Sequence, residues 1–116
     1  MFFSESRVRV YLYGQPTDMR KSFDGLYALV RNSMQLDALS GYLFAFVNRR
    51  ATQIKVLYFD YGGWCLWSKR LECGRFHAPA SQDNYQTMDW TGLKLMLEGI
   101  EPKRYHKRYA LVRNAA

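Results

Sequence analysis

The chain has 116 residues, enough for one domain with its own hydrophobic core. Apolar residues make up 48% of it and aromatic residues 16%, a composition that excludes an intrinsically disordered chain. No apolar run reaches the roughly 18 residues needed to cross a bilayer, and the start, MFFSESRVRV, lacks the pattern of a signal peptide. We therefore expect a soluble, cytoplasmic protein that has no membrane partner.

The formal net charge is +7, from 17 Lys and Arg against 10 Asp and Glu. Such an excess on a small domain favours an anionic partner, most commonly nucleic acid. Many soluble proteins are also basic without binding an anion, so the charge alone leaves both interpretations open.

The cysteines, Cys65 and Cys73, have no CxxC spacing, and the chain has two histidines, His77 and His106. This pattern is typical of free thiols in a reducing compartment rather than of a disulfide or a zinc site. We expect no metal and no cofactor.

In chain order, the first predicted element is a strand over residues 7–14, where RVRVYLYG alternates basic and apolar residues and then becomes aromatic. One long amphipathic helix is predicted next, over Asp18–Met34, with Thr17 as its N-cap. Gly25 inside this helix predicts that another group comes close there. The side chains expected in the core are Phe23, Leu26, Tyr27 and Val30.

Three strands are predicted in the middle of the chain. GYLFAFVN is apolar on both faces and predicts a central strand, followed by IKVLYFD at 54–60 and WCLWSKRL at 64–71. The connections at 49–53 and 61–63 are short, and the second has the glycines of a tight hairpin. These three strands should therefore form an antiparallel meander.

The last third of the domain is predicted to be an irregular stretch over 73–87 and then a short helix. Asp89 or Thr91 can cap this helix, and it should end at Gly99 before Pro102. The predicted fold class is α+β: an antiparallel β-meander sheet with one long amphipathic helix packed on it and a short C-terminal helix. We expect a single domain over 1–102 and a basic C-terminal tail over 103–116.

Enzymatic interpretations find little support in the residues. The chain has no Gly-rich phosphate loop, no GxSxG and no HExxH. A metal-dependent nuclease would need converging carboxylates, and the candidates are Asp18, Asp24 and Asp60. Asp18 and Asp24 diverge around a helix axis, and Asp60 is an ordinary turn residue. The nuclease remains an alternative, but we expect no catalytic residues.

The basic residues are more numerous than the candidate catalytic residues and support a binding role as a set, although any one of them can be a solvated surface charge. Arg and Lys contact phosphate directly, and Arg also clamps base edges. The candidate nucleic-acid-binding residues are Arg49, Arg50, Lys69, Arg70, Arg75, Lys103, Arg104, Lys107 and Arg108. A second charged set lies on the predicted helix, where Asp24 can reach the neighbouring bases. This candidate partner-docking set is Asp18, Arg20, Lys21 and Asp24.

The chain resembles a known family over residues 7–100. The motifs that carry the resemblance are, in order, TDMRKSFDGL, LFAFVNRR, IKVLYFD, GGWCLWSKRLECGRF and LMLEGI. The chain is similar to the small accessory protein TnpB of bacterial insertion sequences of the IS66 family, the Orf2-like proteins. This TnpB is unrelated to the RNA-guided nuclease of the same name.

The resemblance implies a non-catalytic role in DNA transposition beside a separate transposase that carries the DDE catalytic residues. It supplies no catalytic residues to carry over. The implied partners are the transposase of the same element and DNA at the element's ends, and the oligomeric state stays open. Two binding hypotheses follow: a DNA-binding module that uses the basic set, or a protein-docking adaptor without DNA contact. The charged face of TDMRKSFDGL would then be a docking surface or only the start of a helix.

Overall fold

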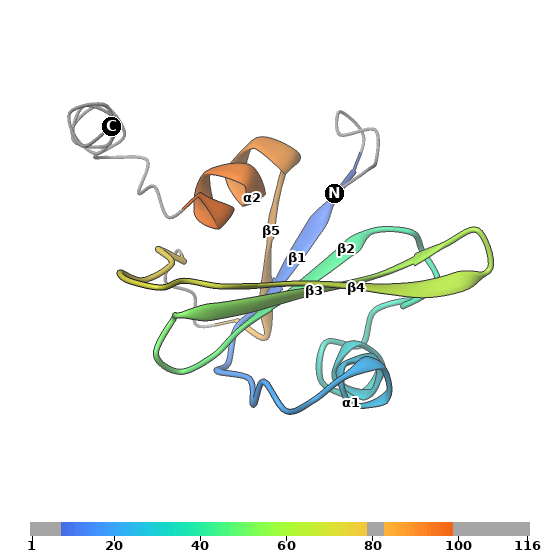
Figure 1. Cartoon of the computed structure of the whole chain (residues 1–116). Coiled ribbons are helices and arrows are strands. Elements are labelled where there is room, and N and C mark those ends of the chain that lie inside the picture. Colours follow the sequence, from blue (N-terminus) through green and yellow to red (C-terminus); the bar gives the residue numbers. More distant parts are fainter. Residues whose placement is uncertain (1–7, 79–82, 99–116) are drawn as a thin grey trace.

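The computed structural model describes residues 8–78 and 83–98 and centres on a five-stranded sheet with helices on both faces (Figure 1). The strand order is β4-β3-β2-β1-β5. The strands are β1 (Val10–Tyr13), β2 (Leu43–Val47), β3 (Gln53–Asp60), β4 (Gly63–Arg70) and β5 (Tyr85–Met88). The helices are α1 (Phe23–Ala28), its π-helical continuation η1 (Leu29–Ser33) and α2 (Trp90–Leu97). An α+β domain with a short C-terminal helix is confirmed.

The predicted meander of β2, β3 and β4 is also confirmed. β3 pairs antiparallel with both neighbours, and its pairing with β4 runs without a break from Gln53↔Arg70 to Asp60↔Gly63. Tyr61 and Gly62 close this hairpin with φ values of 49° and 79°. Positive φ at both central residues is the type I′ turn, whose twist matches that of paired strands.

The sheet extends beyond the predicted antiparallel meander, and it is mostly but not entirely antiparallel. β1 pairs parallel with β2, and the loop and α1 between them form the crossover that parallel strands require. β5, predicted as part of an irregular stretch, pairs antiparallel with β1. Gly14 allows this pairing, because a Cβ there would lie 2.2 Å from the carbonyl oxygen of Asp83.

The long helix over Asp18–Met34 was also a wrong prediction. α1 begins at Phe23, and η1 ends at Ser33, where the Met34 amide donates to the carbonyl of Leu29, 2.9 Å away. Thr17 is buried but caps no helix, because the N-cap position of α1 is Ser22. The backbone N–H of Thr17 instead donates to the carbonyl of Val47 at 2.9 Å. A turn therefore replaces the first predicted helical turns.

Two hydrophobic layers lie on opposite faces of the sheet. Residues alternate along β2, so Leu43 and Ala45 face α2, whereas Phe44 and Phe46 face α1. Leu26, Val30 and Met34 pack against the sheet in the layer on the α1 face. Leu93, Met96 and Leu97 pack against it in the layer on the α2 face. Phe23, which we expected in the core, is 43% exposed. Cys65 is half-buried on β4, Cys73 is exposed, and both are free thiols.

Candidate functional site

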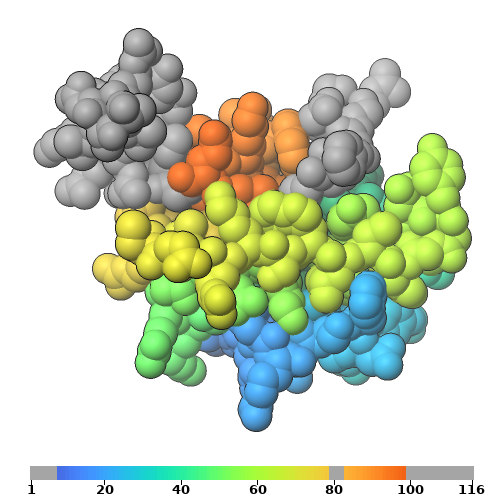
Figure 2. Space-filling model, viewed as in Figure 1, coloured from blue at the N-terminus to red at the C-terminus, as the bar shows by residue number. Residues whose placement is uncertain are grey.

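Arginines from separate but adjoining segments lie at one end of the sheet. Arg49 and Arg50 lie in the β2–β3 connection, and Arg70 ends β4, paired with Gln53 at the start of β3. Arg75 lies in the loop after β4. Figure 2 shows this loop, in yellow, directly beside the green β2–β3 connection. We call these exposed arginines the basic end; its members are Arg49, Arg50, Arg70 and Arg75.

Backbone hydrogen bonds hold the two loops of the basic end together. The Leu71 amide donates to the carbonyl of Thr52 at 2.8 Å, and the Phe76 amide donates to the carbonyl of Ala51 at 2.6 Å. Phe76 is also buried, so its ring anchors the loop that carries Arg75. The basic end is therefore fixed by the sheet and by this anchor.

Asn48 organises the tip of the β2–β3 connection. Its side-chain oxygen accepts hydrogen bonds from the amides of Thr52 at 2.8 Å and Gln53 at 3.1 Å. Its own carbonyl accepts from the amide of Ala51, which has a φ of 57°. The tip is a closed turn that leaves the side chains of Arg49 and Arg50 exposed.

Lys69 and Arg70 point to opposite faces of β4, as the sequence predicted. Arg70 is exposed on the α1 face, whereas Lys69 is half-buried on the α2 face. The Lys69 ammonium donates to the carbonyl of Leu97, 2.6 Å away, at the C-terminus of α2. A cation at that position complements the helix dipole, so Lys69 has a structural contact of its own.

The other predicted bases, Lys103, Arg104, Lys107 and Arg108, lie outside the described residues.

The segment Thr17–Ser22, which we call the TDMRKS loop, is held in place by Lys55 of β3. The Lys55 ammonium donates to the carbonyls of Met19 at 2.8 Å and Lys21 at 2.7 Å. Lys55 lies far along the chain from this loop, and sequence reasoning assigned it no function. The spacing of apolar residues gives no signal for such a contact.

Asp18 completes the turn of the TDMRKS loop. Its carboxylate accepts the backbone N–H of Arg20 at 2.9 Å and pairs with the Arg20 guanidinium, with a shortest contact of 2.6 Å. These hydrogen bonds from Arg20 lower the pKa of Asp18 to about 2. The Arg20 side chain is 91% exposed, so its guanidinium remains open to solvent although it has a partner.

The docking set predicted on the helix is divided by the structure. Asp18, Arg20 and Lys21 belong to the TDMRKS loop, and Asp24 lies in the first turn of α1. Gly25 has the close neighbour that the sequence predicted, since a Cβ there would lie 3.1 Å from Cγ of Lys21.

A groove with both polar and apolar surface includes Asp24 in its lining, and sequence reasoning did not find it. It has a volume of about 280 Å³ and is lined by Phe23, Tyr27, Leu39 and Trp64 besides Asp24. Phe23 is 43% exposed and Leu39 is 58% exposed. We call it the α1 groove.

The carboxylates considered for a nuclease lie apart in the described residues. Within 8–78 and 83–98, no three His, Cys, Asp or Glu side chains gather as a metal site would require. The carboxylate of Asp18 is paired with Arg20, and Asp60 lies at the far end of β3 from the Lys55 contact. The nuclease alternative therefore lacks converging carboxylates in this part of the chain.

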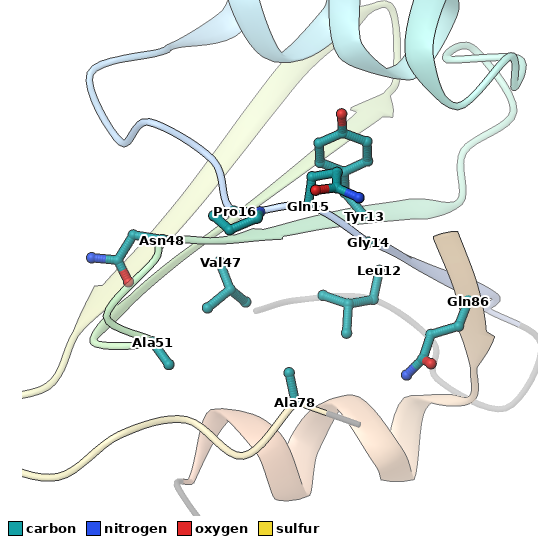
Figure 3. A pocket seen from close by; sticks show the side chains of 10 residues that line it. All are labelled: Leu12, Tyr13, Gly14, Gln15, Pro16, Val47, Asn48, Ala51, Ala78 and Gln86. Carbon is teal, nitrogen blue, oxygen red and sulfur yellow. The ribbon is translucent and has the colours of Figure 1, made fainter. Parts of the chain in front are cut away.

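A second pocket opens where β1 and β2 end, near the start of the TDMRKS loop (Figure 3). Its volume is about 190 Å³, and its lining includes Leu12, Pro16, Val47, Ala51 and Ala78. Cofactor pockets usually measure about 300–1,000 Å³ and hold converging polar groups. The side chains drawn in Figure 3 supply mainly apolar surface, and the amide of Asn48 is already used within its turn.

None of the helices in the described part of the chain has the length and apolar character needed to span a membrane.

The comparisons with known proteins agree with the resemblance drawn from the sequence motifs. The chain is 36% identical over 101 residues to the uncharacterized protein y4hO of Sinorhizobium fredii, covering 87% of this chain and 88% of that protein. It is 30% identical to y4jC of the same organism, covering 87% and 86%. No solved structure matches the chain. A family model described as IS66 Orf2-like protein matches residues 8–107, and the chain therefore belongs to this family of insertion-sequence proteins.

Proposed function

We propose that this chain is a non-catalytic accessory protein of insertion-sequence transposition and that it binds DNA through the basic end. Family membership supports the link to an insertion sequence. The observation that carries the DNA-binding part is that adjoining segments at one end of the sheet carry the four exposed arginines Arg49, Arg50, Arg70 and Arg75. Glu72 is the acid within the same loops, so an excess of positive charge remains there.

The physical basis is phosphate contact by arginines on a rigid scaffold. Guanidinium groups match phosphate geometry with two donors, and they are more weakly hydrated than ammonium groups. Ordered turns reduce the conformational entropy that binding removes, because their backbone is already fixed. Such contacts position a protein on the duplex without reading its sequence. We also assign the tail bases Lys103, Arg104, Lys107 and Arg108 to this interface on their charge.

The test is the affinity of the purified chain for labelled duplexes that carry the element's ends, measured by fluorescence anisotropy. Arg50→Ala should weaken binding, and Arg75→Ala should do so by a similar factor. Lys94→Ala is the matched control, because Lys94 is exposed on α2 and its loss removes the same charge. Equal affinity for Arg50→Ala, Lys94→Ala and the unmodified chain would contradict DNA binding by the basic end.

A second candidate function is docking to the transposase of the same element through the α1 side. The α1 groove supports it, because Phe23 and Leu39 expose apolar surface beside the TDMRKS loop. The flanking charges of Asp18, Arg20, Lys21 and Asp24 would fix the orientation of a partner. Capture of the transposase that is lost on Leu39→Ser and retained on Arg50→Ala would favour this function.

A further inference from the structure

β4 presents a long, free edge. It is the outermost strand of the sheet and has eight residues, and its outer side pairs with no strand of the described residues. The opposite edge strand, β5, has four residues. Short edge strands are a common protection against pairing with another chain, and β4 lacks that protection.

The pairing of β4 with β3 fixes which backbone groups are free. Asp60 and Gly63 flank the two-residue turn and exchange hydrogen bonds, so alternate residues of β4 beyond Gly63 bond to β3. The Leu71 amide continues this pattern through its bond to Thr52. The residues whose N–H and C=O groups point outward are Trp64, Leu66, Ser68 and Arg70.

Other features that block edge pairing are also missing from most of β4. It contains no proline, and its unbroken register with β3 excludes a bulge. Trp64, Cys65, Leu66 and Trp67 are half-buried along its length and keep some apolar surface exposed, and its charged residues lie together at the C-terminal end. A second strand would cover apolar surface on both faces of the sheet.

We propose that a second copy of this chain pairs with β4 in antiparallel orientation, with the two-fold axis at Trp67. In this register Trp67 faces Trp67 of the second copy, Leu66 faces Ser68, and Trp64 faces Arg70. Every outward amide and carbonyl of residues 64–70 then has a partner, and the pair of sheets becomes continuous.

Charge favours antiparallel over parallel pairing. Parallel pairing would set Arg70 beside Arg70 of the other copy, and like charges opposite each other destabilise a sheet. The antiparallel register moves the bases of the two copies to opposite ends of the paired strands. It also places each guanidinium beside an indole ring, a favourable cation–π contact. The chain's net positive charge still opposes association, so added salt should strengthen the dimer.

The first experiment is sedimentation equilibrium of the full chain at increasing concentration, in low and moderate salt. We expect a monomer–dimer equilibrium around the 13.7 kDa monomer, with tighter association at higher salt. Ser68→Pro is the decisive variant, because the Ser68 N–H points outward and proline removes no backbone bond to β3. The hydrogen bond from the Gln53 side chain to the Ser68 hydroxyl is lost equally in Ser68→Ala, which serves as the control. Ser68→Pro should be monomeric with an unchanged circular dichroism spectrum, whereas Ser68→Ala should still dimerise.

Amide hydrogen exchange on the unmodified chain provides a second readout that does not depend on the folding of a variant. The amides of Trp64, Leu66, Ser68 and Arg70 should gain protection as the protein concentration rises. A chain that stays monomeric at every concentration and salt would overturn the proposal. A dimer that leaves these amides unprotected, or that persists in folded Ser68→Pro, would overturn it as well.

Discussion

Replacing Lys55 by methionine tests whether a single ammonium group holds the TDMRKS loop. Methionine keeps the unbranched apolar stem in the half-buried site but removes the donors to the carbonyls of Met19 and Lys21. A hydrogen bond to a charged group contributes about 1.5–3 kcal/mol, and water can replace part of it at this partly exposed site. We therefore expect the free energy of unfolding to fall by about 2–3 kcal/mol.

The assay is urea denaturation followed by tryptophan fluorescence. The midpoint should fall without a change in the slope, because the surface exposed on unfolding stays the same. Lys94→Met is the control, since an exposed lysine on α2 should change stability by no more than about 0.5 kcal/mol. If Lys55→Met and Lys94→Met have the same stability, Lys55 does not anchor the loop and our reasoning fails.

Leu26→Ala should lower the free energy of unfolding by about 3–5 kcal/mol, because Leu26 is completely buried. Phe23→Ala should lower it much less, because Phe23 is 43% exposed, and thermal melts of both variants test this ranking. The hydrogen bonds from Arg20 lower the pKa of Asp18 to about 2, so their contribution to stability is present above the ordinary carboxyl pKa and is lost as the pH falls through about 2. An NMR titration should show the Asp18 pKa rising toward its ordinary value in Arg20→Gln, and an unchanged value would disprove the pairing. Lys69→Met should lower the melting temperature by releasing the C-terminus of α2, yet leave the salt dependence of DNA binding unchanged in anisotropy titrations.

The strands that the sequence predicted well are those whose pairing is set by nearby residues. The Tyr61–Gly62 turn and the short connection after β2 join strands that follow each other directly, so local patterns were sufficient. The start of α1 could not be predicted in this way. Its position depends on Lys55 and Val47, which bind the TDMRKS loop from distant strands. The apolar spacing alone continued the helix back to Asp18.

β5 and the candidate sites show the same limit. Tyr85–Met88 is a short, weakly apolar segment that becomes a strand through its pairing with β1. The sequence placed the basic-end arginines at turns and strand ends, but only the contact between the β2–β3 connection and the loop after β4 brings them together. The α1 groove was missed because Leu39 comes from a loop with no periodic pattern to place it.

The salt dependence of DNA binding tests the proposed function most directly. About four phosphate contacts by the basic end contribute about −3.6 to the slope of log affinity against log salt concentration, so these contacts alone should lower the affinity about 150-fold between 50 and 200 mM salt, and contacts from the tail bases add to this. Each arginine lost from the basic end should reduce the magnitude of this slope by about 0.9, whereas Lys94→Ala should leave it unchanged. Absence of duplex binding at 50 mM salt, or a slope that stays the same without Arg49 and Arg50, would contradict the proposal.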